Sequence, residues 1–132
     1  MANLITFVTN RFDPAKETPN DINPIAGEAV LLWLRQRLTA EGYDITKPQT
    51  EDWGWHVTAA KGGATYMIGA SGEPEEANPE VHWTIQFEKT RSLKDKLFGK
   101  NKLAADDALV RAVERLLRGE ADFRDVSVDT GA

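Results

Sequence analysis

The chain of 132 residues contains no cysteine, and this absence removes several kinds of chemistry at once. Disulfides, zinc–thiolate centres, iron–sulfur clusters and thiol nucleophiles all require that residue. Small secreted domains commonly depend on disulfides, so a chain without cysteine favours a reducing compartment. We therefore expect a cytoplasmic protein.

Long apolar runs are also missing. The longest covers residues 29–34, whereas a membrane-spanning helix needs about 20 consecutive apolar residues. Residues 1–10 carry no basic leader, and threonines interrupt their apolar positions. We therefore expect no transmembrane segment, which agrees with a cytoplasmic location.

The composition is that of an ordinary globular protein, with 41% hydrophobic and 28% charged residues. The length suits a single domain over residues 1–132. A domain of this size can bury a sufficient core without a disulfide or a metal. The sequence also contains no internal repeat and no low-complexity segment.

Hydrophobic periodicity predicts an α+β fold. Period-two alternation indicates strands over residues 4–9, 53–59, 64–70, 81–87 and 123–128. Helical spacing indicates main helices over residues 23–41 and 104–118, and a capping box indicates a short helical turn over 92–99. The expected order is β-α-β-β-β-α-β, with an antiparallel-rich sheet and both main helices packed on one face.

The same patterns assign faces to the elements. The strand around Trp83 alternates most cleanly, and its apolar side is predicted to form the core with both helices. One strand is predicted to place four residues on its core face: Trp53, Trp55, Val57 and Ala59. The first helix, with Asn23 as N-cap and Pro24 at its first position, is apolar on more than one side. Trp33 points away from its main apolar face, which makes it a candidate contact for a partner.

Residues 51–56, with the sequence Glu-Asp-Trp-Gly-Trp-His, form the densest cluster of chemically active side chains. A carboxyl group beside an indole can have a raised pKa and act as a general acid. Glu51 or Asp52 together with His56 would then suit a small hydrolase. The alternative is a structural role, because aromatic residues at strand spacing usually pack in a core.

The stretch Glu51-Asp52-Trp53-Gly54-Trp55 resembles a motif in a family of small, uncharacterised bacterial proteins. The likeness continues in residues 66–69, in the strand of Trp83, in residues 96–100 and in the last helix, and spans residues 26–128. The resemblance implies a shared architecture. It implies no activity and no catalytic residue.

Metal and cofactor patterns are absent from the sequence. His56 and His82 are predicted outward on the same sheet, but an intervening strand would separate their backbones by about 10 Å. A shared ion needs both ring nitrogens at about 2.0–2.1 Å, which this spacing makes awkward. Acids and prolines follow the glycine-rich residues 69–72, so no phosphate-binding loop is indicated. We expect no metal site and no cofactor.

Charge is distributed unevenly along a chain whose net charge is -5. Residues 89–102 hold six basic residues and one acid, a balance of +5, so the rest of the chain carries -10. The basic residues are Lys89, Arg91, Lys94, Lys96, Lys100 and Lys102. Leu93, Leu97 and Phe98 lie among them, which is the pattern of a basic amphipathic segment.

This basic segment has two interpretations. It is either a contact for an acidic protein, a nucleic-acid backbone or a membrane surface, or a solvated connection whose leucine and phenylalanine side chains cover the core. The acidic residues 73–80 of a second copy would offer one such partner surface. Nucleic acid is disfavoured, because the remaining charge of -10 repels phosphates. The sequence therefore predicts a non-catalytic binding or assembly protein acting through protein–protein contacts or self-association, with the hydrolase as the alternative.

Overall fold

The computed structural model describes residues 3–75, 78–99, 103–104 and 107–129, and it confirms the α+β class. Its elements are β1 (Asn3–Thr9), the 3-10 helix η1 (Pro14–Lys16), α1 (Glu28–Ala40), β2 (Asp44–Ile45), β3 (Gln49–Glu51), β4 (Gly54–Lys61), β5 (Ala64–Glu75), β6 (Asn78–Lys89), α2 (Leu93–Phe98), α3 (Ala108–Arg118) and β7 (Arg124–Asp129).

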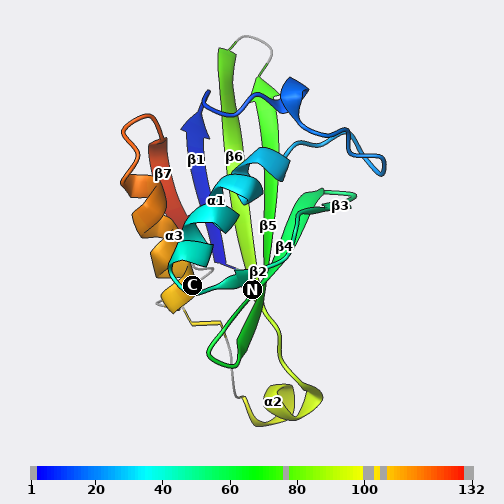
Figure 1. The fold of residues 1–132 in the computed structure, drawn as a ribbon, viewed down its shortest axis with the longest axis vertical. Helices are drawn as coiled ribbons and strands as arrows, with labels where there is room; N and C mark the ends of the chain where they lie inside the picture. Colours follow the sequence, from blue (N-terminus) through cyan, green and yellow to red (C-terminus); the bar gives the residue numbers. More distant parts are fainter. Residues whose placement is uncertain (1–2, 76–77, 100–102, 105–106, 130–132) are drawn as a thin grey trace.

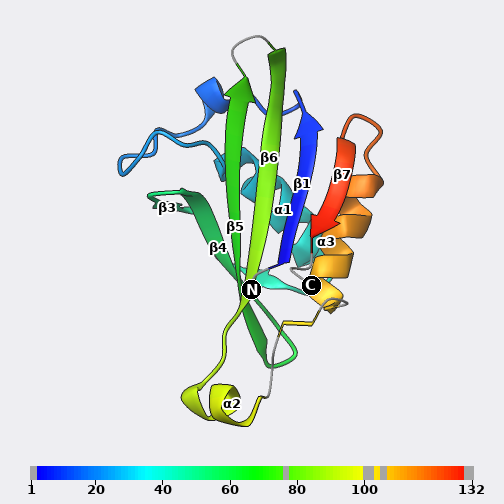
Figure 2. The same cartoon turned by 180° about the vertical axis from the view of Figure 1, so that it is seen from behind.

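The strands form one sheet in the order β2-β4-β5-β6-β1-β7, with β3 also paired to β4. Each of these pairings is antiparallel. The helices α1 and α3 lie against one face of the sheet (Figure 1), and the opposite face carries neither of them (Figure 2). Among the described residues, no helix has the length and apolar character needed to cross a membrane.

The predicted element order missed the two short strands β2 and β3. They pair with opposite ends of β4, β2 with Ala59 and Ala60 and β3 with residues 54–56. Only two and three residues long, they are too short to show a period-two pattern. They are therefore defined by their pairing with β4 and not by a local signal of their own.

The predicted start of the first helix is wrong, since α1 begins at Glu28. The Asn23 side chain is not an N-cap but donates a hydrogen bond to the Asp52 carbonyl at 2.8 Å. Ala26 forms an isolated antiparallel bridge with Gly72 of β5. Pairing of this segment with the sheet and the β3–β4 turn overrides the local helix signal.

A carboxylate from outside the helix caps α1. Its N-cap residue Gly27 makes no side-chain cap, and Glu17 accepts hydrogen bonds from the amides of Gly27, Glu28 and Ala29 at 2.9, 3.0 and 3.1 Å. These are amides that an isolated helix leaves without partners, at the positive end of its dipole. The contact fixes the loop that precedes α1 onto the body of the protein.

A single hydrophobic core fills the space between the sheet and the two main helices. The inward faces predicted for β6 and for α1 are confirmed, since Trp83, Phe87, Leu34 and Leu38 are buried. The helix α3 begins at Ala108, later than predicted, and buries Leu109, Val110, Val113 and Leu117. Leu116 on the same helix is partly buried against the core.

Candidate binding surface and a carboxylate–histidine pair

The helix α2 has the local structure that the sequence predicts. The Ser92 hydroxyl accepts a hydrogen bond from the Asp95 amide at 3.0 Å, and the Asp95 carboxylate accepts one from the Ser92 amide at 3.2 Å. This reciprocal pair is a capping box. Gly99 ends the helix in the left-handed region at φ 66°, where glycine carries no steric penalty.

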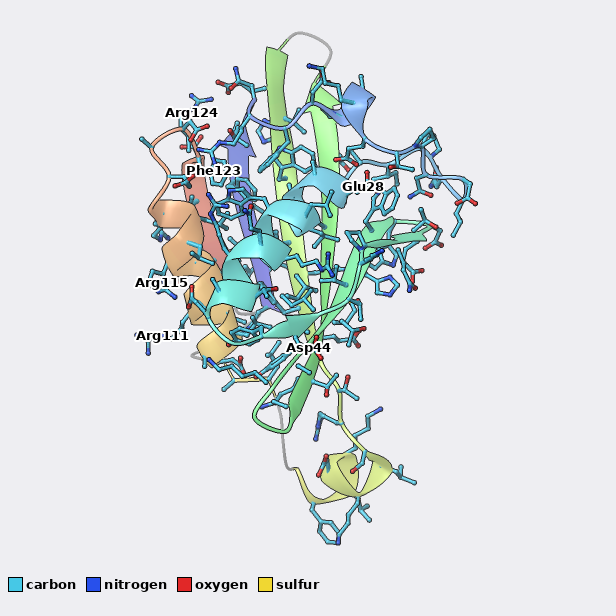
Figure 3. The ribbon with its side chains drawn as sticks, viewed as in Figure 1. Glu28, Asp44, Arg111, Arg115, Phe123 and Arg124 are labelled. Carbon is cyan, nitrogen blue, oxygen red and sulfur yellow. The ribbon has the colours of Figure 1, made fainter. Side chains whose placement is uncertain are left out.

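The apolar side chains of α2 point to solvent. Leu93, Leu97 and Phe98 are 84%, 77% and 62% exposed, and no residue of α2 is buried. The helix stands apart from the sheet and from α1 and α3, at one end of the molecule (Figure 3). The interpretation in which these side chains cover the core is therefore wrong. A cluster of large exposed apolar residues commonly marks an interaction site.

The six basic residues predicted for binding do not form one surface. Lys94 and Lys96 are exposed on α2, beside the apolar cluster. Lys100 and Lys102 lie outside the described residues. Lys89 is only 17% exposed and faces the protein. Of the predicted basic residues, Lys94 and Lys96 thus lie with the exposed apolar side chains of α2, and we call this candidate surface the α2 surface.

Lys89 belongs to a buried polar group. Its ammonium nitrogen lies 3.7 Å from the carboxylate of Asp107, the N-cap of α3. The Tyr66 hydroxyl donates a hydrogen bond to the same carboxylate at 3.2 Å. Burial, followed by the negative charge of Asp107, raises the pKa of Tyr66 to about 12. Arg91 is also engaged, since its guanidinium donates to the Asp95 carbonyl at 3.3 Å.

Among the acidic residues 73–80, those that the structure describes lie at the end of the molecule opposite α2 (Figure 1). They belong to the long antiparallel pair of β5 and β6, which extends away from α2 along the longest axis (Figure 1). Glu73 is exposed, and Glu80 forms an ion pair with Arg124. The charge asymmetry of the sequence is therefore also an asymmetry between the two ends of the structure.

The structure brings Glu51 and His56 together. The β3–β4 hairpin places His56 Nδ1 3.0 Å from Glu51 Oε1, with side chains 21% and 40% exposed. This distance is short enough for an ion pair when the histidine is protonated. The Nδ1 atom nevertheless has no hydrogen-bond partner in the structure. Asp52 is exposed in the turn between the two strands. Of the two predicted carboxylates, Glu51 is thus the one placed against the imidazole.

Trp53 lies on the open face of the sheet, so its predicted place on the core face is wrong. Its ring covers Gly69, where an added Cβ would lie 2.4 Å from the indole. Trp55, two residues later, is buried opposite Ala70 in the core. The intervening Gly54 has φ 148°, within the positive-φ region that side chains rarely adopt, and the chain enters β4 only there. The strand alternation therefore does not extend back to Trp53.

Trp33 makes intramolecular contacts. Its ring packs edge-on against Phe12 and Phe123, with centroids 6.5 and 5.1 Å apart, and the Arg37 guanidinium lies 4.3 Å from its ring centre. Phe123, labelled in Figure 3, joins this aromatic group to β1 through Phe7. The second apolar side of α1 is thus covered by residues of the same chain.

The two histidines lie apart. His56 on β4 pairs with Gly69 on β5, which pairs in turn with Gln86 on β6. His82 lies four residues before Gln86 on β6 and pairs with Glu73 on β5. Within the described part of the chain, no three histidine, aspartate or glutamate side chains are grouped to hold a metal.

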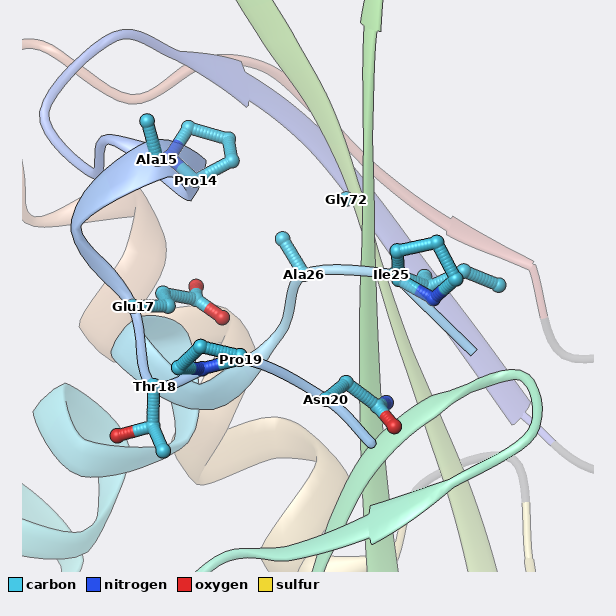
Figure 4. A pocket seen from close by; sticks show the side chains of 10 residues that line it. Pro14, Ala15, Glu17, Thr18, Pro19, Asn20, Ile25, Ala26 and Gly72 are labelled. Atoms are coloured by element: carbon cyan, nitrogen blue, oxygen red, sulfur yellow. The ribbon is translucent and has the colours of Figure 1, made fainter. Parts of the chain in front are cut away.

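A pocket of about 290 Å³ lies beside the loop that precedes α1 (Figure 4). The loop is anchored twice, by Glu17 on the amides of α1 and by the Asn20 amide, which donates to the carbonyls of Glu51 and Gly54 at 3.1 and 2.9 Å. Gly72 of β5 also lines the pocket. Six further lining residues are apolar and three are polar: Pro14, Ala15, Pro19, Pro24, Ile25 and Ala26, with Glu17, Thr18 and Asn20.

A second pocket, of about 480 Å³, lies between the β4–β5 turn and α2. Its charged lining residues are Lys89 and Asp95. Both already take part in the contacts described above, the first with Asp107 and the second in the capping box.

Sequence reasoning missed two polar contacts that shape these features. Glu17 caps a helix that begins 11 residues later, and Asp107 accepts a hydrogen bond from Tyr66, 41 residues earlier. Neither spacing corresponds to a local motif. The sequence pattern placed Asp107 inside a helix over residues 104–118, so neither its role as the N-cap of α3 nor its partner Tyr66 was predicted.

Comparison with known proteins identifies no relative: the chain matches no family model, no curated protein and no solved structure. Its function is therefore argued from its own geometry.

Proposed function

We propose that this chain is a non-catalytic binding or assembly protein, cytoplasmic in location, that docks on another protein through the α2 surface. The observation that supports the proposal is the exposure of Leu93, Leu97 and Phe98 on a capped helix that projects from the body. Burying one such side chain contributes about 1.5–3 kcal/mol, and here that contribution is not used by the fold.

The charges of α2 favour a partner of particular character. Lys94 and Lys96 are exposed beside the apolar side chains. An acidic rim around an apolar surface would complement this arrangement, with the charges accelerating and orienting the encounter and the apolar contacts supplying most of the affinity. We assign the segment a role in protein–protein contact for this reason.

Affinity purification from the native host tests the proposal. The wild type is compared with the triple variant Leu93→Ser, Leu97→Ser, Phe98→Ser, which we expect to fold normally and to lose its specific partners. Leu32→Ser is the matched control, because Leu32 is an exposed apolar residue on α1, outside the α2 surface. An unchanged set of captured proteins in the triple variant would reject the proposal.

A hydrolase is the second candidate, and the contact between Glu51 and His56 favours it. A carboxylate 3.0 Å from Nδ1 would fix the ring proton on that nitrogen if the ring turned to donate to it, which would leave Nε2 able to accept a proton. Trp53 on the adjacent open face would then provide an apolar wall for a substrate. This arrangement corresponds to a general base oriented by a carboxylate.

Turnover of generic ester, phosphate ester and amide substrates tests the second candidate. If the pair is catalytic, His56→Gln abolishes the hydrolysis, Glu51→Gln reduces it, and the neighbouring Asp52→Asn leaves it unchanged. A wild-type rate equal to that of His56→Gln would exclude catalysis by this pair.

The likeness to the bacterial family with the Glu-Asp-Trp-Gly-Trp motif is likewise kept as a proposal. In this chain the motif forms the β3–β4 turn, with Trp53 on the open face and Trp55 in the core. A solved structure of a member of that family would test it, since a shared fold requires the same division of the two tryptophans.

A further inference from the structure

We propose that the partner of the α2 surface is a second copy of this chain, whose apolar pocket beside η1 receives Phe98 in a head-to-tail contact. This inference rests on the function proposed above and names the partner. It joins two features that the fold leaves unused, an exposed apolar projection and an apolar recess.

The size of the pocket suits one large apolar side chain. Its volume is about 290 Å³. An apolar cavity of about 150 Å³ is sufficient to bind a benzene ring, so the ring of Phe98 fits with room for neighbouring atoms. Leu93 and Leu97 would then contact the rim. Aromatic side chains inserted into such recesses commonly dominate the affinity of an interface.

The charges around the pocket complement those of α2. Residues 13–28 contain four acids, Asp13, Glu17, Asp21 and Glu28, and one base, Lys16. Of these acids, Glu17 lines the pocket itself, and Asp13 is exposed directly before the lining residues Pro14 and Ala15. The exposed Lys94 and Lys96 of α2 would approach this acidic surface as Phe98 enters the pocket.

The pocket is formed before any partner arrives. Glu17 holds one side of the loop on the amides of α1, and Asn20 holds the other on the β3–β4 hairpin. A preformed recess binds without the entropic cost of ordering a loop. Figure 4 shows the pocket enclosed by η1, the following loop and the segment that contains Ala26.

The position of the two features decides the kind of assembly. The α2 surface lies at one end of the long axis, and the loop before α1 that lines the pocket lies in the other half of the molecule (Figure 1). A molecule therefore does not fill its own pocket with its own α2. Contacts between two different surfaces propagate from copy to copy, so the expected products are short chains of molecules that lengthen with concentration.

Two variants separate the two halves of this contact. Phe98→Ser removes the projection, and Ala15→Arg adds bulk and positive charge to the pocket at an exposed position. We expect the wild type to show a mass that rises with concentration above the 14.7 kDa of one chain. Each variant should raise the dissociation constant about tenfold or more, and low salt should strengthen the wild-type association.

The decisive experiment mixes the two variants. Phe98→Ser keeps an intact pocket and Ala15→Arg keeps an intact α2, so the mixture should form a dimer of two chains and nothing larger. Sedimentation measures the mass, and Leu32→Ser should associate as the wild type does. Circular dichroism checks that each variant is folded, and Leu97→Ser with Pro19→Arg provides an independent pair.

Three results would overturn the inference: a wild type that keeps the mass of one chain at all concentrations and salt levels, variants that associate as strongly as the wild type, or a mixture that does not associate. Binding of the monomeric wild type to phosphatidylserine vesicles, lost in Phe98→Ser, would show that α2 docks on lipid instead. Loss of a foreign protein partner in the triple α2 variant, with a monomeric wild type, would reject self-association but keep the proposed function.

Discussion

The helices α2 and α3 follow each other along the chain and are built by similar local rules. Each begins with an aspartate or serine cap that binds a backbone amide, and each is followed by a glycine. Their apolar faces differ in what they meet. α3 buries Leu109, Val110, Val113 and Leu117 against the sheet, whereas α2 buries nothing.

This difference shows that amphipathicity and burial are separate properties. The sequence pattern of a helix shows that it has an apolar face. Whether the same chain covers that face depends on where the helix lies in the tertiary structure. In α3 the apolar face stabilises the fold. In α2 it is exposed to solvent, and we propose that another molecule covers it. Changes in α3 should then affect mainly stability, and changes in α2 mainly binding.

The largest expected effect lies in the core that α1 and α3 cover. Trp83 is buried, packs edge-on against Phe12, and fills the space over Gly72. Trp83→Ala should lower the free energy of unfolding by about 3–5 kcal/mol, through lost burial and a residual cavity. Urea unfolding followed by circular dichroism measures this. A stability equal to that of the wild type would contradict the assignment of Trp83 to the core.

Truncating one leucine in each helix tests whether α3 contributes to the core and α2 does not. Leu117→Ala on α3 should destabilise by about 2–5 kcal/mol, because that side chain is fully buried. Leu97→Ala on α2 should change stability by no more than about 0.5 kcal/mol, since the side chain is 77% exposed. Thermal melts of the two variants provide the measurement. Equal losses would show that α2 contributes to the core after all.

The third prediction concerns the buried cap of α3 at alkaline pH. Because the pKa of Tyr66 rises to about 12 in the folded protein from 10.0, the unfolded chain loses this proton first. The stabilisation is complete below pH 10 and is lost as the pH rises towards 12, by about 2–3 kcal/mol. The raised pKa of Tyr43 acts in the same direction.

Urea unfolding between pH 9 and 12 measures this dependence. In Tyr66→Phe the decline with pH should be shallower than in the wild type. Identical slopes in the two proteins would show that Tyr66 ionises as freely in the folded state as in the unfolded chain.

The smallest expected effect concerns the N-terminal cap of α1. Glu17→Ala removes the carboxylate that accepts from three amides of α1, and caps of this kind contribute about 0.5–2 kcal/mol. Chemical denaturation should show a loss in this range. Thr18→Ala is a suitable control, because its exposed side chain lies next to Glu17 in the same loop. An equal loss in the control would assign the effect to the loop backbone.

The sequence predicted the elements with long and regular patterns and failed where a partner distant in sequence decides the structure. β6 alternates over residues 81–87, and the residues predicted inward there are buried. The start of α1 was missed, because Ala26 pairs with Gly72 and Glu17 supplies the cap. Local propensity contains no information about either contact.

For the candidate sites, the sequence identified the segments but not their surroundings. The capping box and the apolar residues of α2 were predicted. The exposure of those apolar side chains depends on the direction that the chain takes after β6, which the sequence pattern does not specify. The turn at Gly54 brings Glu51 to His56 and moves Trp53 to the open face, which strand alternation could not show. Lys89, counted with the basic segment, is drawn to Asp107 by tertiary packing.

The position of Trp53 has an optical consequence. Of the four tryptophans, Trp55 and Trp83 are buried and Trp33 packs against the core, whereas Trp53 lies over Gly69 on the open face. Its indole should be the most accessible to soluble quenchers, and its fluorescence emission should lie at the longest wavelength. A molecule that binds beside Glu51 and His56 would shield this indole from water and shift its emission to shorter wavelength. The chain therefore carries its own fluorescent reporter for the open face of the sheet.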